Sequence, residues 1–512
     1  MRGLFRRILL TTTLTVTTFV VLVLLYHLYF NWQAASRWKQ YQLQQEAVGT
    51  KLAWNDFIPA KVPDELNFAL TPMVAGSLEG EFAPGLGKPN GESGQPVDRL
   101  SMPCFIGSHL PDDDGWNHSK ITDLGWWQRY YRDAAAQTNF FPVPERSGSA
   151  AGDVLFSLSI YSNAIEILRT ASRLPYSRFP LAYEKQRPTE ILLPHLGPLV
   201  SCCKTLQLRA VAELDLHQTA KGLEDVELLL RLANSIRAEP IPLSQAYRAR
   251  MLSIGLQPIW QGITLHKWSD AQLNELESRL AGSELLADYQ NAICAARAAF
   301  IAEVEGLRRE HHRLAYLRAN GGDLQLDSHS SWLIPYLLWM PSGWAHENEL
   351  YFAMVCEHDG VPSVDVAHHR VFPAQVHNME QAAGAATNGM RHLWAGITLP
   401  LIFHHTVKVA YMQSMIDMAR LAVALERCRM ATGEYPDKLE DLIPRWVEPV
   451  MITKDVMSGE ELKYRQLGKN DYKLYSVGWN ETDDGGELSA TSTGGIDYEN
   501  GDWVWPHREF SH

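Results

Sequence analysis

The chain has 512 residues, of which 46% are hydrophobic and 21% charged, and its formal net charge is −13. This apolar fraction excludes a disordered protein and provides for a large folded core. The 59 acidic side chains outnumber the 46 basic ones, and no cluster of Lys and Arg follows the first few residues. A nucleic-acid partner is therefore not expected, because such proteins neutralise phosphates with clustered cations.

An uncharged segment near the N-terminus predicts a membrane-spanning helix. Residues 8–30 (ILLTTTLTVTTFVVLVLLYHLYF) contain no Asp, Glu, Lys or Arg. At ~1.5 Å per residue they reach roughly 34 Å, enough to cross the hydrocarbon core. Arg2, Arg6 and Arg7 precede them, so the positive-inside rule keeps the N-terminus in the cytoplasm. We expect residues 1–31 to anchor the chain in the inner membrane, with the bulk of the chain periplasmic.

A cleaved signal peptide is the alternative for this segment. Signal peptides have apolar regions of ~7–15 residues that end at a small-x-small site. Here the apolar run is longer, and Ala34-Ala35-Ser36 matches such a site poorly. An uncleaved anchor is therefore favoured. Pro- and Gly-rich stretches such as GLGKPNGESGQP then predict a loop-rich juxtamembrane region over residues 32–118.

Residues 119–400 are expected to form an α-helical domain. Apolar residues recur at helical spacing in two neighbouring segments, Leu206, Ala210, Val211 and Leu214 in the first and Leu223, Val226, Leu230 and Ala233 in the second. This pattern predicts an antiparallel helical pair within a bundle or an irregular solenoid. No second copy follows at a fixed period, so a repeat array is not predicted. Ser269 and Gln272 match a capping box that begins a further helix.

The C-terminal region, residues 401–512, combines a helix with short strands. An apolar stripe over residues 412–423 predicts a helix that ends at Gly433, as a C′ glycine would end it. Alternating residues over 461–465 and 471–477 predict a hairpin, and 503–505 a third strand. The expected fold is thus mainly α, with an N-terminal transmembrane helix and a small C-terminal α+β module.

This order of elements resembles the globular end of type II secretion pseudopilins, in which a long helix closes at a G-x-YP turn before a small antiparallel sheet. The carrying segments are MATGEYPDKLEDLI and the strand end YSVG. The resemblance covers residues 412–505 and implies a calcium site in the following loop. A true pseudopilin would combine a short basic leader, a peptidase site and a Glu near the start of the mature helix. This N-terminus lacks that combination, so the resemblance does not imply a pilus subunit.

The residues of the implied calcium site are Asn480, Asp483, Asp484 and Asp497. Hard oxygen donors that converge within a loop suit Ca²⁺. Two departures weaken the match, because Asn480 stands where the family usually has Asp and the spacer ELSATSTGG before Asp497 is long. An ordinary Asp/Gly turn without metal stays open as the alternative. Upstream, Asp112-Asp113-Asp114-Gly115 is interpreted as a solvated turn.

Much of the remaining chain resembles a family of uncharacterised membrane-anchored bacterial proteins. The stretches that carry this resemblance are VPDELNFALTP, RLPYSRFPL, LLPHL, WSDAQL and GEYPDKLEDLIP. This resemblance implies no activity. Function must therefore be inferred from architecture.

Local catalytic signatures are missing from the sequence. It contains no H-E-x-x-H, G-x-S-x-G, Walker A or dinucleotide G-x-G-x-x-G motif. The pairs His311-His312, His368-His369 and His404-His405 do not present two ligands on one helix face. Glu303 and Glu305 fall on different helix faces and are expected to be solvated. The six cysteines are expected either to form up to three disulfides or to be buried thiols.

Two hypotheses of function follow. The first is a non-catalytic interaction or assembly module of the envelope, bound to the lipid bilayer through residues 8–30 and to a protein partner. The second is a periplasmic hydrolase whose catalytic groups are dispersed in the sequence. Converging carboxylates or histidines in a deep pocket would favour the hydrolase.

The run WLIPYLLWMP at 332–341 is too short to span a membrane and predicts a buried connection, or else a loop that dips into the membrane.

Overall fold

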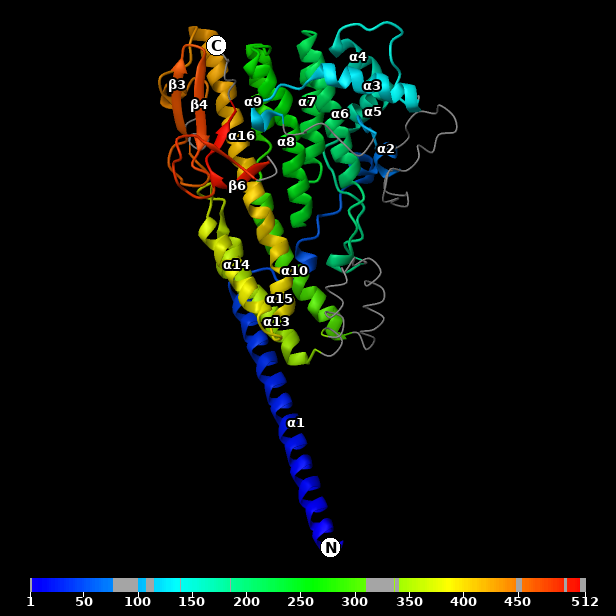
Figure 1. Ribbon diagram of the computed structural model, residues 1–512, viewed down its shortest axis with the longest axis vertical. Coiled ribbons are helices and arrows are strands. Elements are labelled where there is room, and N and C mark those ends of the chain that lie inside the picture. Colours follow the sequence, from blue (N-terminus) through cyan, green and yellow to red (C-terminus); the bar gives the residue numbers. More distant parts are fainter. Residues whose placement is uncertain are drawn as a thin grey trace.

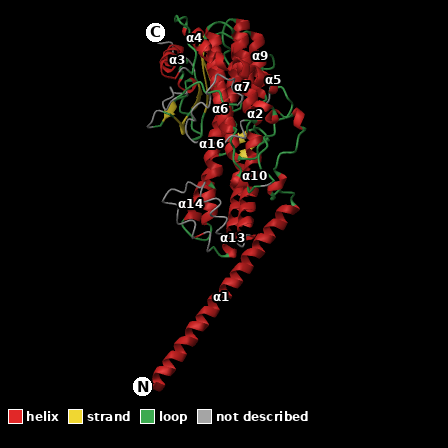
Figure 2. Cartoon of the chain, turned by 90° about the vertical axis from the view of Figure 1, so that its right-hand side faces the viewer, coloured by secondary structure: helices red, strands yellow, loops and turns green. Residues whose placement is uncertain are grey.

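The computed structural model describes residues 2–76, 100–106, 115–138, 140–184, 186–309, 336, 340–447, 454–491 and 495–506. It is mainly α, with 63% helix, a long apolar N-terminal helix and small antiparallel sheets near the C-terminus, which confirms the expected fold class. The helices form an elongated body, and α1 (Arg2–Ala47) projects from one end with the N-terminus at its far tip (Figure 1). Figure 2 shows this projection from the side.

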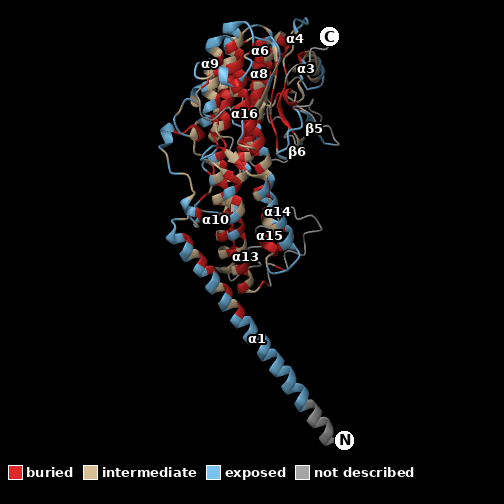
Figure 3. Cartoon of the chain, turned by 90° about the vertical axis from the view of Figure 1, so that its left-hand side faces the viewer, coloured by how far each residue is buried: buried red, intermediate tan, exposed pale blue. Residues whose placement is uncertain are grey.

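Helix α1 is continuous because no Gly or Pro occurs between Leu4 and Val48. Its 46 residues extend for roughly 69 Å at ~1.5 Å each, and Gly49 at φ +78° follows its end. The apolar part of α1 is exposed and is long and apolar enough to cross a membrane. Beyond it, one face of α1 becomes buried against the body (Figure 3).

The body contains two sets of helices. The upper set, next to the short helix α2 (Pro72–Ala75), comprises α3 (Leu124–Thr138), α4 (Ala150–Ser157), α5 (Ser162–Ala171), α6 (Leu196–Asp215), α7 (Thr219–Asn234), α8 (Pro242–Thr264) and α9 (Asp270–Ala281). Helix α10 (Leu286–Arg309) runs from this set towards the end from which α1 projects, and it packs on both α8 and α13 (Figure 1). The set nearer α1 comprises α13 (Ser342–Val355), α14 (Pro373–Thr387) and α15 (Leu393–Thr398). The predicted antiparallel pair is α6 and α7, and the Ser269–Gln272 capping box starts α9 as expected.

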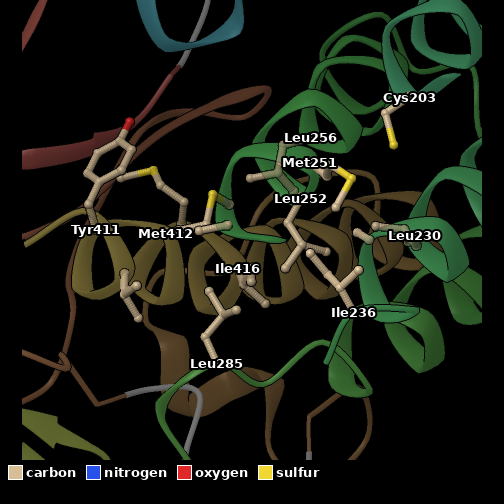
Figure 4. Close-up of a cluster of buried hydrophobic side chains, with 14 of the residues drawn as sticks. Cys203, Leu230, Ile236, Met251, Leu252, Leu256, Leu285, Tyr411, Met412 and Ile416 are labelled. Atoms are coloured by element: carbon tan, nitrogen blue, oxygen red, sulfur yellow. The ribbon is translucent and has the colours of Figure 1, made fainter. Parts of the chain in front are cut away.

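Helix α16 (Pro400–Thr432) connects both sets. It ends where the sequence predicts, at Gly433, whose φ of 91° is left-handed. Buried side chains join α16 to α8, among them Met412, Ile416 and Leu252 (Figure 4). One hydrophobic core extends from Trp54 to Trp505, so apolar packing does not divide at residue 401. The domain boundaries inferred from the sequence stay predictions.

Three small antiparallel sheets complete the described residues. The predicted hairpin and third strand are present in the order β3-β4-β7, and the remaining strands pair as β5-β6 and β1-β2. The bounds are β1 (Val364–Asp365), β2 (Arg370–Val371), β3 (Lys463–Gly468), β4 (Asp471–Ser476), β5 (Leu488–Ala490), β6 (Ile496–Gly501) and β7 (Trp503–Trp505). A short 3-10 helix, Leu439–Leu442, lies between α16 and β3. All six cysteines are free.

Candidate functional site

A cavity of about 630 Å³ opens beside the start of α10. Its walls are the segment 56–62, the turn 172–178, the end of α7 with the turn that follows, and the first residues of α10. Ligand pockets in proteins typically measure ~300–1,000 Å³, so this space could accommodate a small ligand or part of a partner. We call it the arginine cavity, because Arg178, Arg231 and Arg237 line it.

Two stretches noted in the sequence pair to form one wall of the arginine cavity. Asn67 of VPDELNFALTP donates from Nδ2 to the Arg178 carbonyl and accepts the Arg178 amide at Oδ1, both at 2.8 Å. The Phe68 amide donates to the Tyr176 carbonyl at 2.8 Å. Arg178 Nε donates to the Pro59 carbonyl at 2.9 Å. The stretch RLPYSRFPL is therefore held against residues 59–68 by specific hydrogen bonds, which fixes the shape of this wall.

A third stretch, LLPHL, supports the same region from behind. The His195 ring stacks on Phe179 with 4.1 Å between centroids, and its Nε2 lies 2.7 Å from Glu239 Oε1. Glu239 also accepts the Ser244 hydroxyl. His195 is 0% exposed, so it cannot reach a substrate in the cavity. These contacts position the connection between α7 and α8, which carries Arg237.

Positive charge prevails in the arginine cavity. Its three arginines face Asp56 and Asp288, a local balance of +1 in a chain of −13. Asp288 is shared between Arg237 Nε and the buried Arg248, each at 2.7 Å. Burial and the neighbouring Arg279 lower the pKa of Arg231. A guanidinium beside other guanidiniums gains from an added anion, because the anion relieves their mutual repulsion.

The lining of the arginine cavity suits binding better than acid–base catalysis. The described residues that line it include no histidine and no cysteine. Asp288 is committed to two arginines, as described above. Arg178 pairs with Glu184 at 3.3 Å and Arg231 with Glu227 at 3.2 Å, and both keep further N–H donors beside the space, together with the half-exposed Tyr176 ring. Such groups recognise carboxylates and peptide amides.

The predicted calcium residues lie in the loop after β4. Asn480 Nδ2 donates to Asp484 Oδ2 at 3.0 Å. Asp483 Oδ1 accepts the Gly485 amide at 3.0 Å and the Tyr475 hydroxyl at 3.1 Å. The structure therefore brings these three loop residues together on one turn. Backbone amides and a hydroxyl already donate hydrogen bonds to their carboxylates.

Asp497 lies apart from these three residues, in strand β6. Its Oδ1 accepts the Glu499 amide at 3.0 Å, and its Oδ2 accepts Asn500 Nδ2 at 2.9 Å. Asp497 is stabilised by its own neighbours, which lower its pKa.

The sequence reasoning missed Asp502, an acid that does face the loop. Asp502 is 1% exposed and accepts the Gly486 and Asp484 amides. Burial raises its pKa, and the nearby Asp483 and Asp484 raise it further. Its position directly before the buried Trp503 was the available signal. In the part of the chain that the structure describes, no three His, Cys, Asp or Glu side chains are grouped to hold a metal. Calcium binding stays a prediction.

Other candidate groups have structural partners. His369 Nε2 lies 2.8 Å from Asp417 Oδ2 within the body. The expectation that Glu303 is solvated is wrong, because Glu303 is 3% exposed and accepts the Thr189 hydroxyl at 2.8 Å. Its helix face turns inward because α10 is covered on more than one side. The pair His311-His312, the Asp112 turn and most of 332–341 lie outside the described residues, although Tyr336 and Met340 are buried.

No family model, curated protein or solved structure matches this chain. The pseudopilin-like order of the C-terminal elements and the stretches around the arginine cavity are therefore resemblances only. Function is inferred from α1 and from the geometry of the cavity.

Proposed function

We propose that the protein is a single-pass inner-membrane protein whose body lies on the periplasmic side and binds a protein partner without catalysing a reaction. The observation that carries this proposal is the continuity of α1. One uninterrupted helix contains both the exposed apolar segment and a face packed on the body. The three arginines before the apolar segment support a cytoplasmic N-terminus.

The contacts of α1 favour an uncleaved anchor over a signal peptide. Phe30, Ala34, Trp38, Tyr41 and Gln45 are buried along one helix face. They surround the small-residue site at 34–36. The Gly343 amide donates to Asn31 Oδ1 at 2.8 Å on one side of that site, and Arg37 pairs with Glu347 at 2.9 Å on the other. Cleavage would remove packed residues and leave the start of α13 uncovered.

The arginine cavity is the proposed binding site for an acidic segment of the partner. Arginine and tyrosine contribute strongly to interface energies, and both line this cavity. The net negative charge of the whole chain disfavours nonspecific contact with acidic partners, so a local cationic cavity provides selectivity. The C-terminal region, with its pseudopilin-like order of elements, is consistent with a role in secretion or envelope assembly.

Site-specific photo-crosslinking in intact cells tests the proposal. A photoreactive residue at Tyr176, in the arginine cavity, should capture a discrete partner protein. The same group at Leu192, which is 73% exposed and outside the cavity, is the matched control. Arg231→Glu should abolish capture from position 176. Equal capture from both positions, or none from either, would contradict the proposed site.

Topology is tested separately with reporter fusions. Reporters that are active only outside the cytoplasm should be active when fused after Gln45 and after His512. Activity at neither position would place the body in the cytoplasm and overturn the proposed orientation, whatever the crosslinking result.

A further inference from the structure

A second cavity, of about 510 Å³, adjoins the arginine cavity. The two share Phe57 and Asn291. The second cavity is bounded by the end of α1 at Gln45, by the segment 48–51 and by the first half of α10. We call it the α1 cavity. It lies where the anchor helix meets the body.

Arg297 places a buried guanidinium beside the α1 cavity. The residue lines the cavity and is only 4% exposed. Its one hydrogen bond runs from Nη2 to the Lys51 carbonyl at 3.3 Å, and its buried Nε has no partner. No carboxylate of the described residues lies within 4.0 Å of this guanidinium. A buried guanidinium that is neither paired nor fully hydrogen-bonded is costly, so the arrangement favours an anion that is supplied from outside.

Arg248 is a buried arginine of the same region whose hydrogen bonds are complete, and it serves as a comparison for Arg297. Its side chain is 0% exposed, and it donates to Asn234 Oδ1, to the Glu284 carbonyl and to Asp288 Oδ2. Asp288 and Arg297 are nine residues apart on α10, about two and a half helix turns. The structure therefore satisfies one buried guanidinium completely and leaves the neighbouring one open to a cavity.

The charge around the α1 cavity selects the class of anion. Lys51 and Arg297 oppose Glu357, a balance of +1 among the described lining residues. Glu357 is already engaged, because Gln45 Nε2 donates to its Oε1 at 2.7 Å. A single negative charge matches this balance. A phosphate dianion would exceed it and would be repelled by Glu357.

We propose that the α1 cavity is a carboxylate-binding site in which Arg297 receives the carboxylate through its planar fork and Lys51 adds a second positive charge. This site lies beyond the proposed function, which concerns the arginine cavity. The carboxylate can belong to a small organic acid or to an acidic side chain of a peptide that continues from the adjoining cavity. Because Gln45 of α1 and Arg297 of α10 both border the site, an occupant would bridge the anchor helix and the body.

Calorimetric titration of the full-length chain in detergent tests the site. The probes are propionate, the peptide acetyl-Gly-Glu-Gly-amide, its Gln counterpart and inorganic phosphate. Wild-type protein should bind at least one carboxylate probe and should bind neither the Gln peptide nor phosphate comparably. Binding of propionate alone or with the peptide indicates a small acid, and binding of the Glu peptide alone indicates a protein segment.

Variants assign the binding to Arg297. Arg297→Gln should weaken carboxylate binding by roughly tenfold or more, because a charged hydrogen-bond partner is lost. Arg297→Lys should retain part of the affinity, and Arg465→Gln, an exposed arginine of β3 that lines neither cavity, should leave it unchanged. If Arg297→Gln does not fold, Lys51→Gln at the exposed edge should weaken binding several-fold. The proposal is overturned by wild-type protein that binds no carboxylate, by equal phosphate binding, or by affinity that these variants at 297 and 51 do not change.

Discussion

The packing of α1 on the body should depend on Trp38. This side chain is 3% exposed and belongs to a small buried cluster with Tyr41, Ile301, Leu350 and Ala353. A buried tryptophan removes ~150–250 Å² from water, which corresponds to ~4–6 kcal/mol at ~25 cal/mol/Å². Measured Trp→Ala changes in cores cost ~3–5 kcal/mol. Trp38→Ala should therefore weaken the docking of α1 by at least ~3 kcal/mol.

The population in which α1 has left the body can be measured by thiol labelling. Ala34→Cys places a thiol in the buried face of α1, where Ala34 is 2% exposed, and Cys294→Ser removes the partly exposed native thiol. Labelling then follows the open population. A loss of ~3 kcal/mol should accelerate it by about 100-fold, since each ~1.4 kcal/mol is a factor of ten.

Trp32→Ala is the control on the same helix. Trp32 is 66% exposed, so its replacement should change the free energy of docking by less than ~0.5 kcal/mol. Equal labelling rates in the Trp38→Ala and Trp32→Ala proteins would refute the packed arrangement of α1.

Three further predictions concern the body. Burial and the nearby Asp225 raise the pKa of Glu213 from 4.5 to about 8, so the folded state keeps a proton that the unfolded chain loses, and stability should fall as pH rises through that interval. Glu213→Gln should remove this loss, seen as a higher melting temperature than wild type at pH 8 but not at pH 4.5. Millimolar Ca²⁺ at ten times its dissociation constant should stabilise the closed loop 480–486 by about 1.4 kcal/mol and so slow its proteolysis. Asp484→Ala should abolish this protection. A cleavage rate that is the same with Ca²⁺ and with chelator would exclude the site. Gly433→Ala should destabilise the fold by ~1–2 kcal/mol, because the φ of 91° at this position is unfavourable for a residue with a Cβ. Gly384→Ala, with open space around it, should not destabilise the fold. Equal melting temperatures of the two variants would contradict the role of the left-handed backbone at Gly433.

Features encoded by local pattern were predictable from the sequence. The long apolar helix α1 follows from an uncharged run, the α6–α7 pair from helical periodicity, and the end of α16 from Gly433. The strands β3, β4 and β7 follow from alternation and turn residues. Each of these signals acts over a few residues, so no knowledge of tertiary contacts was required.

The cavities could not be predicted, because distant residues build them. Asn67 meets Arg178 across 111 positions, and Lys51 meets Arg297 across 246. The sequence around Arg297 does not indicate that its guanidinium is buried without a charged partner. The burial of Glu303 is equally invisible to a local pattern, since its partner Thr189 is 114 positions away. The predicted calcium residues are those that follow β4 along the chain, whereas Asp502 reaches the loop through the pairing of β7 with β4.

The intact mass of the protein extracted from membranes tests the central claim most directly. The claim is that α1 is retained as an anchor and continues as one helix into the body. It predicts a chain that keeps residues 2–35 and loses at most Met1. A mature chain that begins near Ser36 would contradict it, because such a protein would have neither the apolar segment nor the contact between Asn31 and Gly343.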